Sequence, residues 1–385
     1  MMEDSRIEHK PNLFLISPGP KYNLEHAFSD RCRGLSESFS GQILTSGPDS
    51  LEVRMGSFSV CCLGDKKGHS LYLFMLFIKA GFRLIKEKRK SGVDRSGFDL
   101  IVTYDPLKTG LIAYVLSFFS GIPFCVEVNG DYTSEVLYRE VKGKYRRRLK
   151  RWIFCSVERF VLNRAVGIKL LYDNQIDYFK PLRHKPVIDR FPDYVNTLGM
   201  SNRGEEKIVL LVGFPLFVKG VDVLIDAFKT VSSEFPEWRL KILGFYPDKK
   251  QLEGLIGGHK RIFHHPPVDP SEIPEHIGRC GIFVLPSRTE AMGRVLIEAM
   301  ACAKPRIGSA VGGIPTVIDD GRDGLLFHSE DVSGLADKLR LLMAKPDERQ
   351  RLGQAAAERY RREFTRDKYF SQLSEFYRLV ISCSL

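Results

Sequence analysis

Residues 281–300 read GIFVLPSRTEAMGRVLIEAM. The apolar run GIFVLP has the composition of a buried strand, and GRVLIEAMA has the apolar spacing of a helix that begins near Gly293. Glu290 lies in the intervening loop, and Glu298 lies in the second turn of the helix. The stretch therefore predicts a strand–loop–helix unit with two carboxylates close to the carboxyl end of a strand.

The same alternation continues on both sides of this unit. Further strands are expected at EKIVLLVG, RLKILG and PRIGSA, and earlier in the chain at NLFLISP, GQILTSG, FSVCCLG, FDLIVTYDP, IPFCVEVNG and VGIKLLY. Most are continuous apolar runs, which are typical of parallel sheets covered on both faces. The polar segment 190–206 has the composition of a linker. We therefore predict an α/β protein with two Rossmann-like, doubly wound domains, 1–198 and 199–365, which face each other across a cleft.

Composition narrows the class of protein. Of the 385 residues, 43% are hydrophobic and 27% are charged, as expected of a packed globular chain. The eight cysteines have no zinc or disulfide spacing, which favours a reducing compartment, and the N-terminus has no apolar signal segment. The apolar run 110–128 is interrupted by Gly121-Ile122-Pro123, so a buried helix and strand explain it better than a membrane span.

The net charge of +11 is concentrated in the first half of the chain. Residues 139–151 contain eight Lys and Arg against Glu140, within a helical pattern whose apolar stripe comprises Tyr145, Leu149, Trp152, Ile153, Val157 and Phe160. The cations that lie mostly away from this stripe are Arg146, Arg147, Arg148, Lys150 and Arg151. Such a helix is either a solvated surface or a binding surface for anionic lipid headgroups. No RNA- or DNA-binding motif accompanies it, so we expect no nucleic-acid partner.

The two glutamates have a chemical interpretation. The free amides at the start of the helix near Gly293 can bind phosphate. Each carboxylate can accept hydrogen bonds from a pair of sugar hydroxyls. A phosphate group between two polyols describes a nucleotide sugar, although a solvated helix glutamate is the common alternative. The pair His264-His265 has no neighbouring ligand cluster for a metal, and we expect it in a loop beside the nucleotide base.

Three stretches resemble the retaining glycosyltransferases of family 4, which have the GT-B fold. They are VLPSRTEAMGRVLIEAMACAKP (284–305), VGGIPTVIDDGRDGLLF (311–327) and VGFPLFVKGVDVLIDAF (212–228). The first contains the family's signature of two glutamates separated by seven residues. The resemblance is dense over 206–330 and looser over 1–195, where VEVNGD (126–131) is the best match.

The resemblance implies a role for each matched residue. Glu290 would contact the transferred sugar, Glu298 would hold the nucleotide ribose, and Lys219 would neutralise the departing diphosphate. Asn129 stands where the family often has a catalytic-site histidine, and Phe214 stands where it usually has an arginine that contacts the diphosphate. The remaining positions that the resemblance assigns to donor binding are Gly19, Gly213, Met292, Gly293, Arg294 and Val295. Family members need neither a catalytic metal nor another cofactor.

The resemblance also implies a function. We expect a cytoplasmic enzyme, peripheral on the inner face of the cell membrane, that transfers a hexose-type sugar with retention to a lipid-linked or glycan acceptor. Assembly of a polysaccharide or lipopolysaccharide is the natural setting, and the helix at 366–385 is expected to cross back onto the first domain. Two alternatives stay open: a nucleotide-sugar epimerase of the same fold, and a non-catalytic nucleotide-sugar-binding subunit, for which Phe214 and Asn129 argue.

Overall fold

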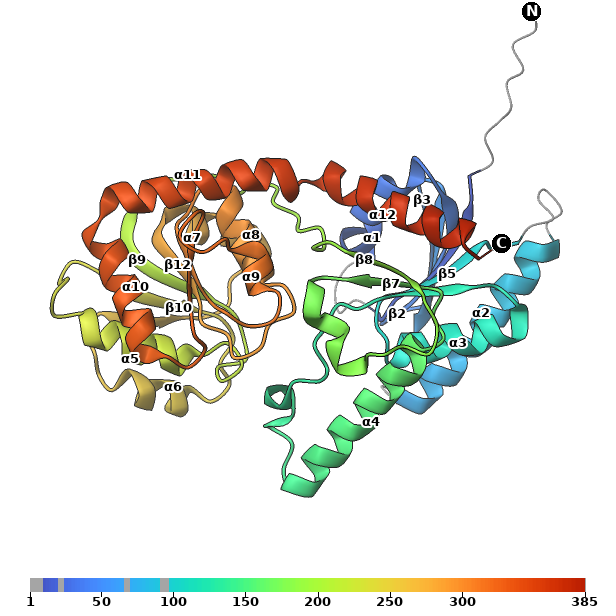
Figure 1. Cartoon of the computed structure of the whole chain (residues 1–385), viewed down its shortest axis with the longest axis horizontal. Coiled ribbons are helices and arrows are strands. Elements are labelled where there is room, and N and C mark those ends of the chain that lie inside the picture. The colour runs from blue at the N-terminus through green and yellow to red at the C-terminus, as the bar shows by residue number, and fades with distance from the viewer. Residues whose placement is uncertain (1–9, 20–23, 66–69, 91–96, 385) are drawn as a thin grey trace, which may run out of the picture. The chain divides into compact units, whose positions relative to one another are not determined.

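The chain forms two compact α/β units (Figure 1). The computed structural model describes residues 10–19, 24–65, 70–90 and 97–384. The first unit extends to Thr133 and also contains Arg148–Phe191 and the chain from Phe370 onward. The second unit comprises Ser134–Arg147 and Pro192–Tyr369. This division differs from 1–198 and 199–365 because the segment Ser134–Arg147 makes its contacts within the second unit and the first unit ends at Phe191.

The first unit is built on an eight-stranded sheet with the order β3-β4-β2-β1-β5-β6-β7-β8. All neighbouring strands are parallel except β3 and β4, which are antiparallel. The strands are β1 (Asn12–Ile16), β2 (Ser40–Gly47), β3 (Leu51–Met55), β4 (Phe58–Gly64), β5 (Leu100–Thr103), β6 (Phe124–Glu127), β7 (Gly167–Leu170) and β8 (Val187–Arg190).

Helices cover both faces of this sheet, which is why every residue of its strands β1, β5, β6 and β7 is buried. Figure 1 shows α2, α3 and α4 on one side and α1 with α12 on the other. Phe14 and Ile16 of β1 pack with the first group, and Phe370 of α12 packs against Gly34 of α1. The helices are α1 (Leu24–Ser36), α2 (Ser70–Lys90), α3 (Lys108–Ser120), α4 (Lys144–Leu162) and α12 (Arg366–Ser382), with 3₁₀ turns η1 (Glu135–Tyr138) and η2 (Asp173–Phe179).

The second unit is built on a six-stranded, fully parallel sheet with the order β11-β10-β9-β12-β13-β14. The strands are β9 (Glu206–Val212), β10 (Arg239–Leu243), β11 (Ile262–His265), β12 (Cys280–Leu285), β13 (Arg306–Ser309) and β14 (Leu325–Phe327). The helices are α5 (Val221–Val231), α6 (Lys249–Ile256), α7 (Ile273–Arg279), α8 (Arg294–Ala301), α9 (Ile314–Val317), α10 (Val332–Ala344) and α11 (Pro346–Glu363), with the 3₁₀ turn η3 (Pro270–Glu272).

Both sheets confirm the predicted class of fold, but several elements were not anticipated. The strands β3, β8, β11 and β14 and the helices α6, α7, α9 and α11 are additional to the expected set. The expectation of a loop at His264-His265 is wrong, because both residues belong to β11 and pair with Ile242 and Leu243 of β10. Within the part of the chain that the structure describes, every helix is too short or too polar to cross a membrane.

Candidate active site

Two of the expected catalytic side chains form an ion pair in the second unit. The Lys219 Nζ donates to Glu290 Oε2 at 2.5 Å, and the side chains are only 18% and 14% exposed. Ser287 Oγ donates to the same carboxylate oxygen at 3.2 Å. Lys219 follows β9 and Glu290 follows β12, and these strands are neighbours in the sheet. Their loops therefore meet at the carboxyl edge, where doubly wound sheets bind ligands.

The glycine-rich run after β13 supports the backbone of Glu290. Gly312 has φ +50°, and a Cβ atom at this position would lie 1.9 Å from the carbonyl oxygen of Glu290. Gly313 donates its backbone N–H to the same carbonyl at 3.1 Å. Any side chain at Gly312 would push the two loops apart. The AVGGIP run thus holds the carboxylate-bearing loop in place.

The start of α8 offers free backbone amides beside this pair. Gly293 is the N-cap with φ +80°, and no side chain caps the helix. Arg294 is exposed and Val295 is half-buried, whereas Met292 is buried and its Sδ accepts a hydrogen bond from the amide of Asp193 at 3.1 Å. Uncapped amides at a helix start favour an anion such as phosphate.

Glu298 lies one turn further along α8. Burial raises the pKa of its carboxyl group, and the nearby Arg294 guanidinium opposes this shift. Its carboxylate makes no hydrogen bond or ion pair with any residue that the structure describes. A largely buried carboxyl group without a protein partner has full capacity for ligand hydroxyls.

Arg288 is a site residue that the sequence analysis missed. It makes a bidentate ion pair with Asp222 at 2.8 Å and donates to the carbonyl of Phe217 at 2.8 Å. Its backbone N–H donates to the carbonyl of Val218, also at 2.8 Å. These contacts tie the loop that carries Lys219 to the loop that carries Glu290. The sequence offers no signal for this, because Arg288 and Asp222 are far apart along the chain.

The two expected site residues of the first unit follow β1 and β6, which β5 separates in the sheet. Gly19 follows β1, and a Cβ atom there would lie 1.9 Å from the carbonyl oxygen of Ser46. Asn129 follows β6, and its Nδ2 donates to the carbonyl of Tyr104 at 3.1 Å. The buried Oδ1 of Asn129 has no hydrogen-bond partner among the described residues. An acceptor atom is therefore available at the carboxyl edge of this sheet.

Acidic side chains that the sequence analysis did not identify gather near Asn129. Burial, with smaller contributions from the nearby Asp131 and Asp105, raises the pKa of Glu158 on α4 from its ordinary value of 4.5 to about 8. Burial also raises the pKa of Asp105, although hydrogen bonds from Thr109 and nearby amides oppose the shift. Glu158 is 2% exposed, and its Oε2 lacks a hydrogen-bond partner in the described part of the chain. Glu158 is therefore largely protonated at neutral pH.

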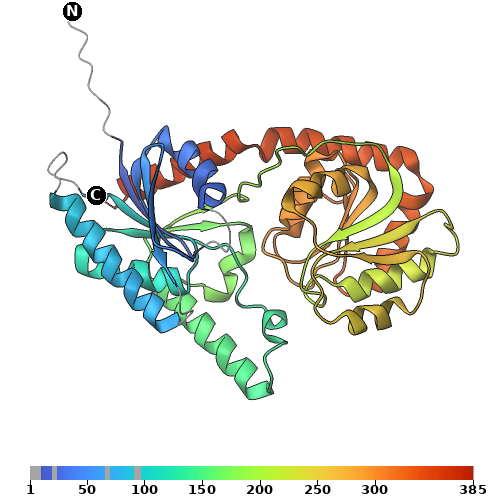
Figure 2. The same ribbon diagram turned by 180° about the vertical axis from the view of Figure 1, so that it is seen from behind.

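The basic residues of α4 are mostly exposed, and so are four of the six residues of its apolar stripe. Arg146, Arg147, Arg148 and Lys150 are exposed, whereas Arg151 is half-buried and its Nε donates to the carbonyl of Thr133 at 2.7 Å. Tyr145 is 87% exposed and Trp152 is 66% exposed, and Leu149 and Ile153 are exposed as well. Figure 2 shows the N-terminal turns of α4 extending past α2 and α3. The stripe thus packs only through its C-terminal half.

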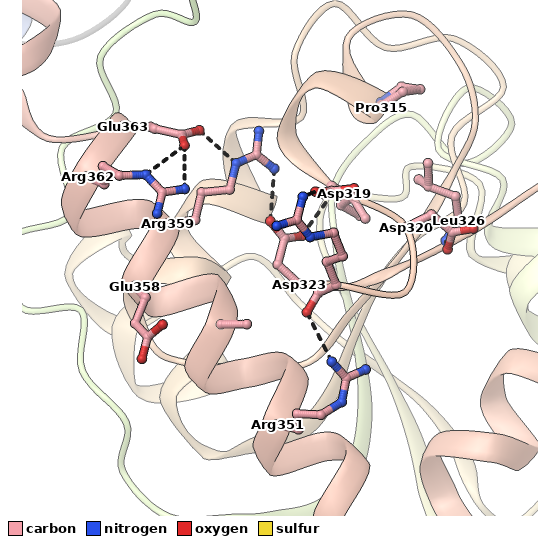
Figure 3. Close-up of a pocket in the computed structure, with 13 residues that line it drawn as sticks. Pro315, Asp319, Asp320, Asp323, Leu326, Arg351, Glu358, Arg359, Arg362 and Glu363 are labelled. Atoms are coloured by element: carbon pink, nitrogen blue, oxygen red, sulfur yellow. Dashed lines mark hydrogen bonds and ion pairs between the residues drawn. The ribbon is translucent and has the colours of Figure 1, made fainter.

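A polar hollow of about 690 Å³ lies elsewhere in the second unit, between α11 and residues 315–326 (Figure 3). Most of its charged groups are paired with other groups of the same unit. Arg359 donates to Asp323 at 2.9 Å and to Glu363 at 2.7 Å, and Arg351 donates to the carbonyl of Gly321 at 2.9 Å. None of the residues implied by the resemblance lines this hollow. Its polar groups therefore serve the packing of α11.

The described residues contain no group of three or more His, Cys, Asp and Glu side chains that could hold a metal ion. The positive groups beside Glu290 are Lys219, the α8 amides and the exposed Arg294. They could compensate a phosphate charge together, which is the chemistry that the resemblance assigns to them.

Comparison with known proteins gives the site its context. Residues 200–359 match the family described as Glycosyl transferases group 1. An uncharacterized glycosyltransferase of Methanocaldococcus jannaschii is 26% identical over 283 residues, which cover 72% of this chain and 75% of that protein.

Solved structures match the fold over almost the whole chain. Sucrose-phosphate synthase from Thermosynechococcus elongatus superposes with a TM-score of 0.76 at 19% identity, covering 97% of this chain and 100% of that one. Anabaena HepE, solved in complex with UDP, superposes with a TM-score of 0.70 at 16% identity, covering 96% and 100%. At these identities the similarity establishes the fold.

Proposed function

Because this chain belongs to the group 1 glycosyltransferases and has the GT-B fold, we propose that it transfers a hexose-type sugar, with retention, from a nucleoside diphosphate to a hydroxyl group of a lipid-linked or glycan acceptor. The observation that carries the proposal is the Lys219–Glu290 pair beside the uncapped start of α8. A cation, a carboxylate and free amides together match a diphosphate next to a sugar.

Each group has a defined task in this reaction. The bond between the anomeric carbon and the diphosphate oxygen breaks, so negative charge develops on the leaving diphosphate. Lys219 and the α8 amides stabilise that charge, which is greater in the transition state than in the bound donor. Glu290 holds hydroxyls of the transferred sugar beside the reacting carbon. Glu298 binds the ribose hydroxyls. The acceptor hydroxyl oxygen forms the new glycosidic bond, and its proton passes to the departing diphosphate.

The ion pair also has a consequence for donor binding. Lys219 already contacts Glu290 at 2.5 Å, so the diphosphate and the sugar must compete with an existing interaction. Donor binding therefore replaces one carboxylate partner of Lys219 by phosphate oxygens and frees Glu290 for hydroxyl groups. The pair keeps both side chains pre-positioned until the donor arrives.

The setting is the cytoplasmic face of the cell membrane, in polysaccharide or lipopolysaccharide assembly. The support for this part of the proposal is α4, where exposed cations flank the exposed apolar side chains of Tyr145, Leu149, Trp152 and Ile153. An amphipathic basic helix of this kind suits an anionic lipid surface. A lipid-linked acceptor would then be bound close to the membrane.

The proposal is tested by incubating the purified protein with UDP-, GDP- and ADP-sugars, with and without membrane extract, and following release of the nucleoside diphosphate. We expect one donor to be consumed faster when the acceptor-containing extract is present. Donor conversion without any acceptor would favour an epimerase, and tight donor binding without turnover would favour a non-catalytic subunit.

Glu290→Gln should then lower kcat more than it lowers donor affinity, because the carboxylate acts on the reacting sugar. The exposed Glu253→Gln in the same unit is the matched control. Wild-type turnover in Glu290→Gln would remove Glu290 from the catalytic residues.

A further inference from the structure

Two exposed phenyl rings stand side by side at the carboxyl edge of the second sheet. Phe214 is 47% exposed and Phe245 is 56% exposed. Their ring centroids are 5.6 Å apart with an interplanar angle of 61°. Phe214 follows β9 and Phe245 follows β10, and these two strands are parallel neighbours. Large exposed aromatic side chains next to a polar site indicate a binding surface.

The backbone beneath these rings is built to bring them together. A Cβ atom on Gly244 would lie 2.4 Å from the carbonyl oxygen of Gly213, so the two strand ends approach as closely as glycine allows. Tyr246 is buried, and its hydroxyl donates to the same Gly213 carbonyl at 2.7 Å. Its ring lies 6.5 Å from that of Phe214. The backbone that carries the two exposed rings is therefore held in place by the Tyr246 hydrogen bond and by the close packing of Gly244 on Gly213.

The pair is continuous with the candidate donor site. The Lys219 side chain packs on Gly213, the residue before Phe214. A Cβ atom added to Gly213 would lie 3.1 to 3.3 Å from three carbons of that side chain. Along the sheet edge, Glu290 follows β12, Lys219 follows β9 and Phe245 follows β10, which is the order of the strands themselves. Adjacent strands are about 4.8 Å apart, so a ligand held at Glu290 and Lys219 reaches the phenyl pair within ~10 Å.

The chemistry of the rings selects the part of the ligand that they contact. Phenyl groups carry no charge and cannot compensate phosphate, but their faces stack on flat π systems. A nucleobase is the planar portion of a nucleotide sugar, and stacking on an aromatic side chain contributes about 1–3 kcal/mol per base. We propose that Phe214 and Phe245 form the stacking platform for the nucleobase of the donor. This assignment rests on the proposed function, because it takes the donor to be a nucleotide sugar.

Binding measurements with two kinds of probe, nucleoside diphosphates and base-free pyrophosphate, test the stacking platform. Affinities for UDP, GDP, ADP and inorganic pyrophosphate are measured by calorimetry for the wild type, Phe214→Ala, Phe245→Ala and the double variant. We expect each single variant to lose roughly five- to 100-fold in affinity for the preferred nucleoside diphosphate, the range given by 1–3 kcal/mol. Pyrophosphate has no base, so its affinity should stay at the wild-type value. Phe245→Trp should retain nucleotide binding.

Phe119→Ala is the matched control, because Phe119 is an exposed phenylalanine of the first unit. Equal losses for pyrophosphate and nucleotide would overturn the platform, as would unchanged nucleotide affinity in the double variant. A wild-type protein that binds pyrophosphate as tightly as every nucleoside diphosphate would also overturn it, while leaving a phosphate site. A wild type that binds neither probe would overturn the proposed function together with the platform.

Discussion

Glu298 is the residue that we propose binds the ribose, and its carboxylate makes no hydrogen bond or ion pair with any residue that the structure describes. We expect Glu298→Ala to weaken the binding of the nucleoside diphosphate itself, since the lost hydrogen bonds to a charged acceptor amount to roughly 1.5–3 kcal/mol, or about ten- to 100-fold in affinity. Calorimetry with the nucleotide measures this directly, and Glu358→Ala on the exposed side of α11 is the control. Unchanged affinity in a folded Glu298→Ala protein would remove the ribose assignment.

Glu158 allows a test of stability against pH. Burial raises the pKa of its carboxyl group to about 8 in the folded chain, whereas the unfolded group titrates near 4.5. Between these values the unfolded state releases a proton that the folded state keeps, so the free energy of unfolding falls as pH rises through this window. Glu158→Gln removes the effect. We therefore expect the variant to gain stability over the wild type at pH 8, on the order of a few kcal/mol, and to gain little at pH 4.5.

Urea unfolding of both proteins at the two pH values measures the difference. Glu140→Gln alters an exposed glutamate just before α4 and should leave the pH dependence unchanged. An equal stability gain at both pH values would show that packing, rather than protonation, explains the effect of Glu158→Gln.

At the scale of single elements, α4 exposes both cations and large apolar side chains to solvent. Replacing Arg146, Arg147, Arg148 and Lys150 with glutamine should weaken binding to vesicles that contain anionic lipid, by ~1 kcal/mol for each cation. Binding of the wild type should also fall as salt rises, because the Debye length shrinks from about 10 Å at 0.1 M to about 3 Å at 1 M. Vesicle sedimentation measures both effects.

The control for the vesicle experiment is a variant in which four exposed cations of the second unit are replaced by glutamine. They are Arg239, Lys249, Lys250 and Lys260. Nucleotide binding should survive in both variants. Vesicle binding that is absent, or that ignores salt, would make α4 an ordinary solvated helix and would favour a soluble acceptor.

The predicted elements differ from the missed ones in the strength of their hydrophobic pattern. Long apolar runs such as β9 and β12 are buried on both faces, and their pattern was sufficient. β14 has three residues, β3 is largely exposed, and α11 buries small residues such as Gly353 and Ala356, so all three carry a weak hydrophobic signal. The antiparallel pairing of β3 with β4 depends on tertiary contacts that periodicity does not encode.

In the candidate site, the sequence predicted individual residues but not the contacts between them. The resemblance identified Lys219 and Glu290 separately, but their contact depends on β9 lying next to β12, and strand order cannot be read from spacing. The clamp of Arg288 on Asp222 likewise appears only once the two loops are folded together. The apolar stripe of α4 was identified correctly as a pattern, yet four of its six residues are exposed, because amphipathicity does not say what covers a helix.

At the scale of the whole molecule, the chain returns to the first unit at its C-terminal end. Tyr377 of α12 is buried and donates its hydroxyl proton to Glu127 of β6, and Arg31 of α1 donates to the same hydroxyl at 2.7 Å. Glu127 also pairs with Arg31 and is fully buried. The three side chains connect a strand and two helices that are far apart in the sequence.

We expect Tyr377→Phe to destabilise the first unit by about 1.5–3 kcal/mol, because it removes hydrogen bonds to charged groups in a buried position. Scanning calorimetry should show the transition of the first unit lowered by roughly 2–4 °C for each kcal/mol. The transition of the second unit should stay in place. Tyr178→Phe is the control, since Tyr178 is an exposed tyrosine of the same unit. A shift of both transitions together would mean that the units unfold as one.

The same return of the chain governs the order in which the protein is finished during translation. A ribosome makes Pro192–Tyr369, nearly all of the second unit, before it makes Phe370 and the residues that follow. Until then the first unit lacks α12, and the apolar surface that Leu373, Phe376, Tyr377 and Val380 cover is open to solvent. The half of the molecule that emerges first is therefore completed last, and its sheet lacks the helix α12 throughout the synthesis of the other half.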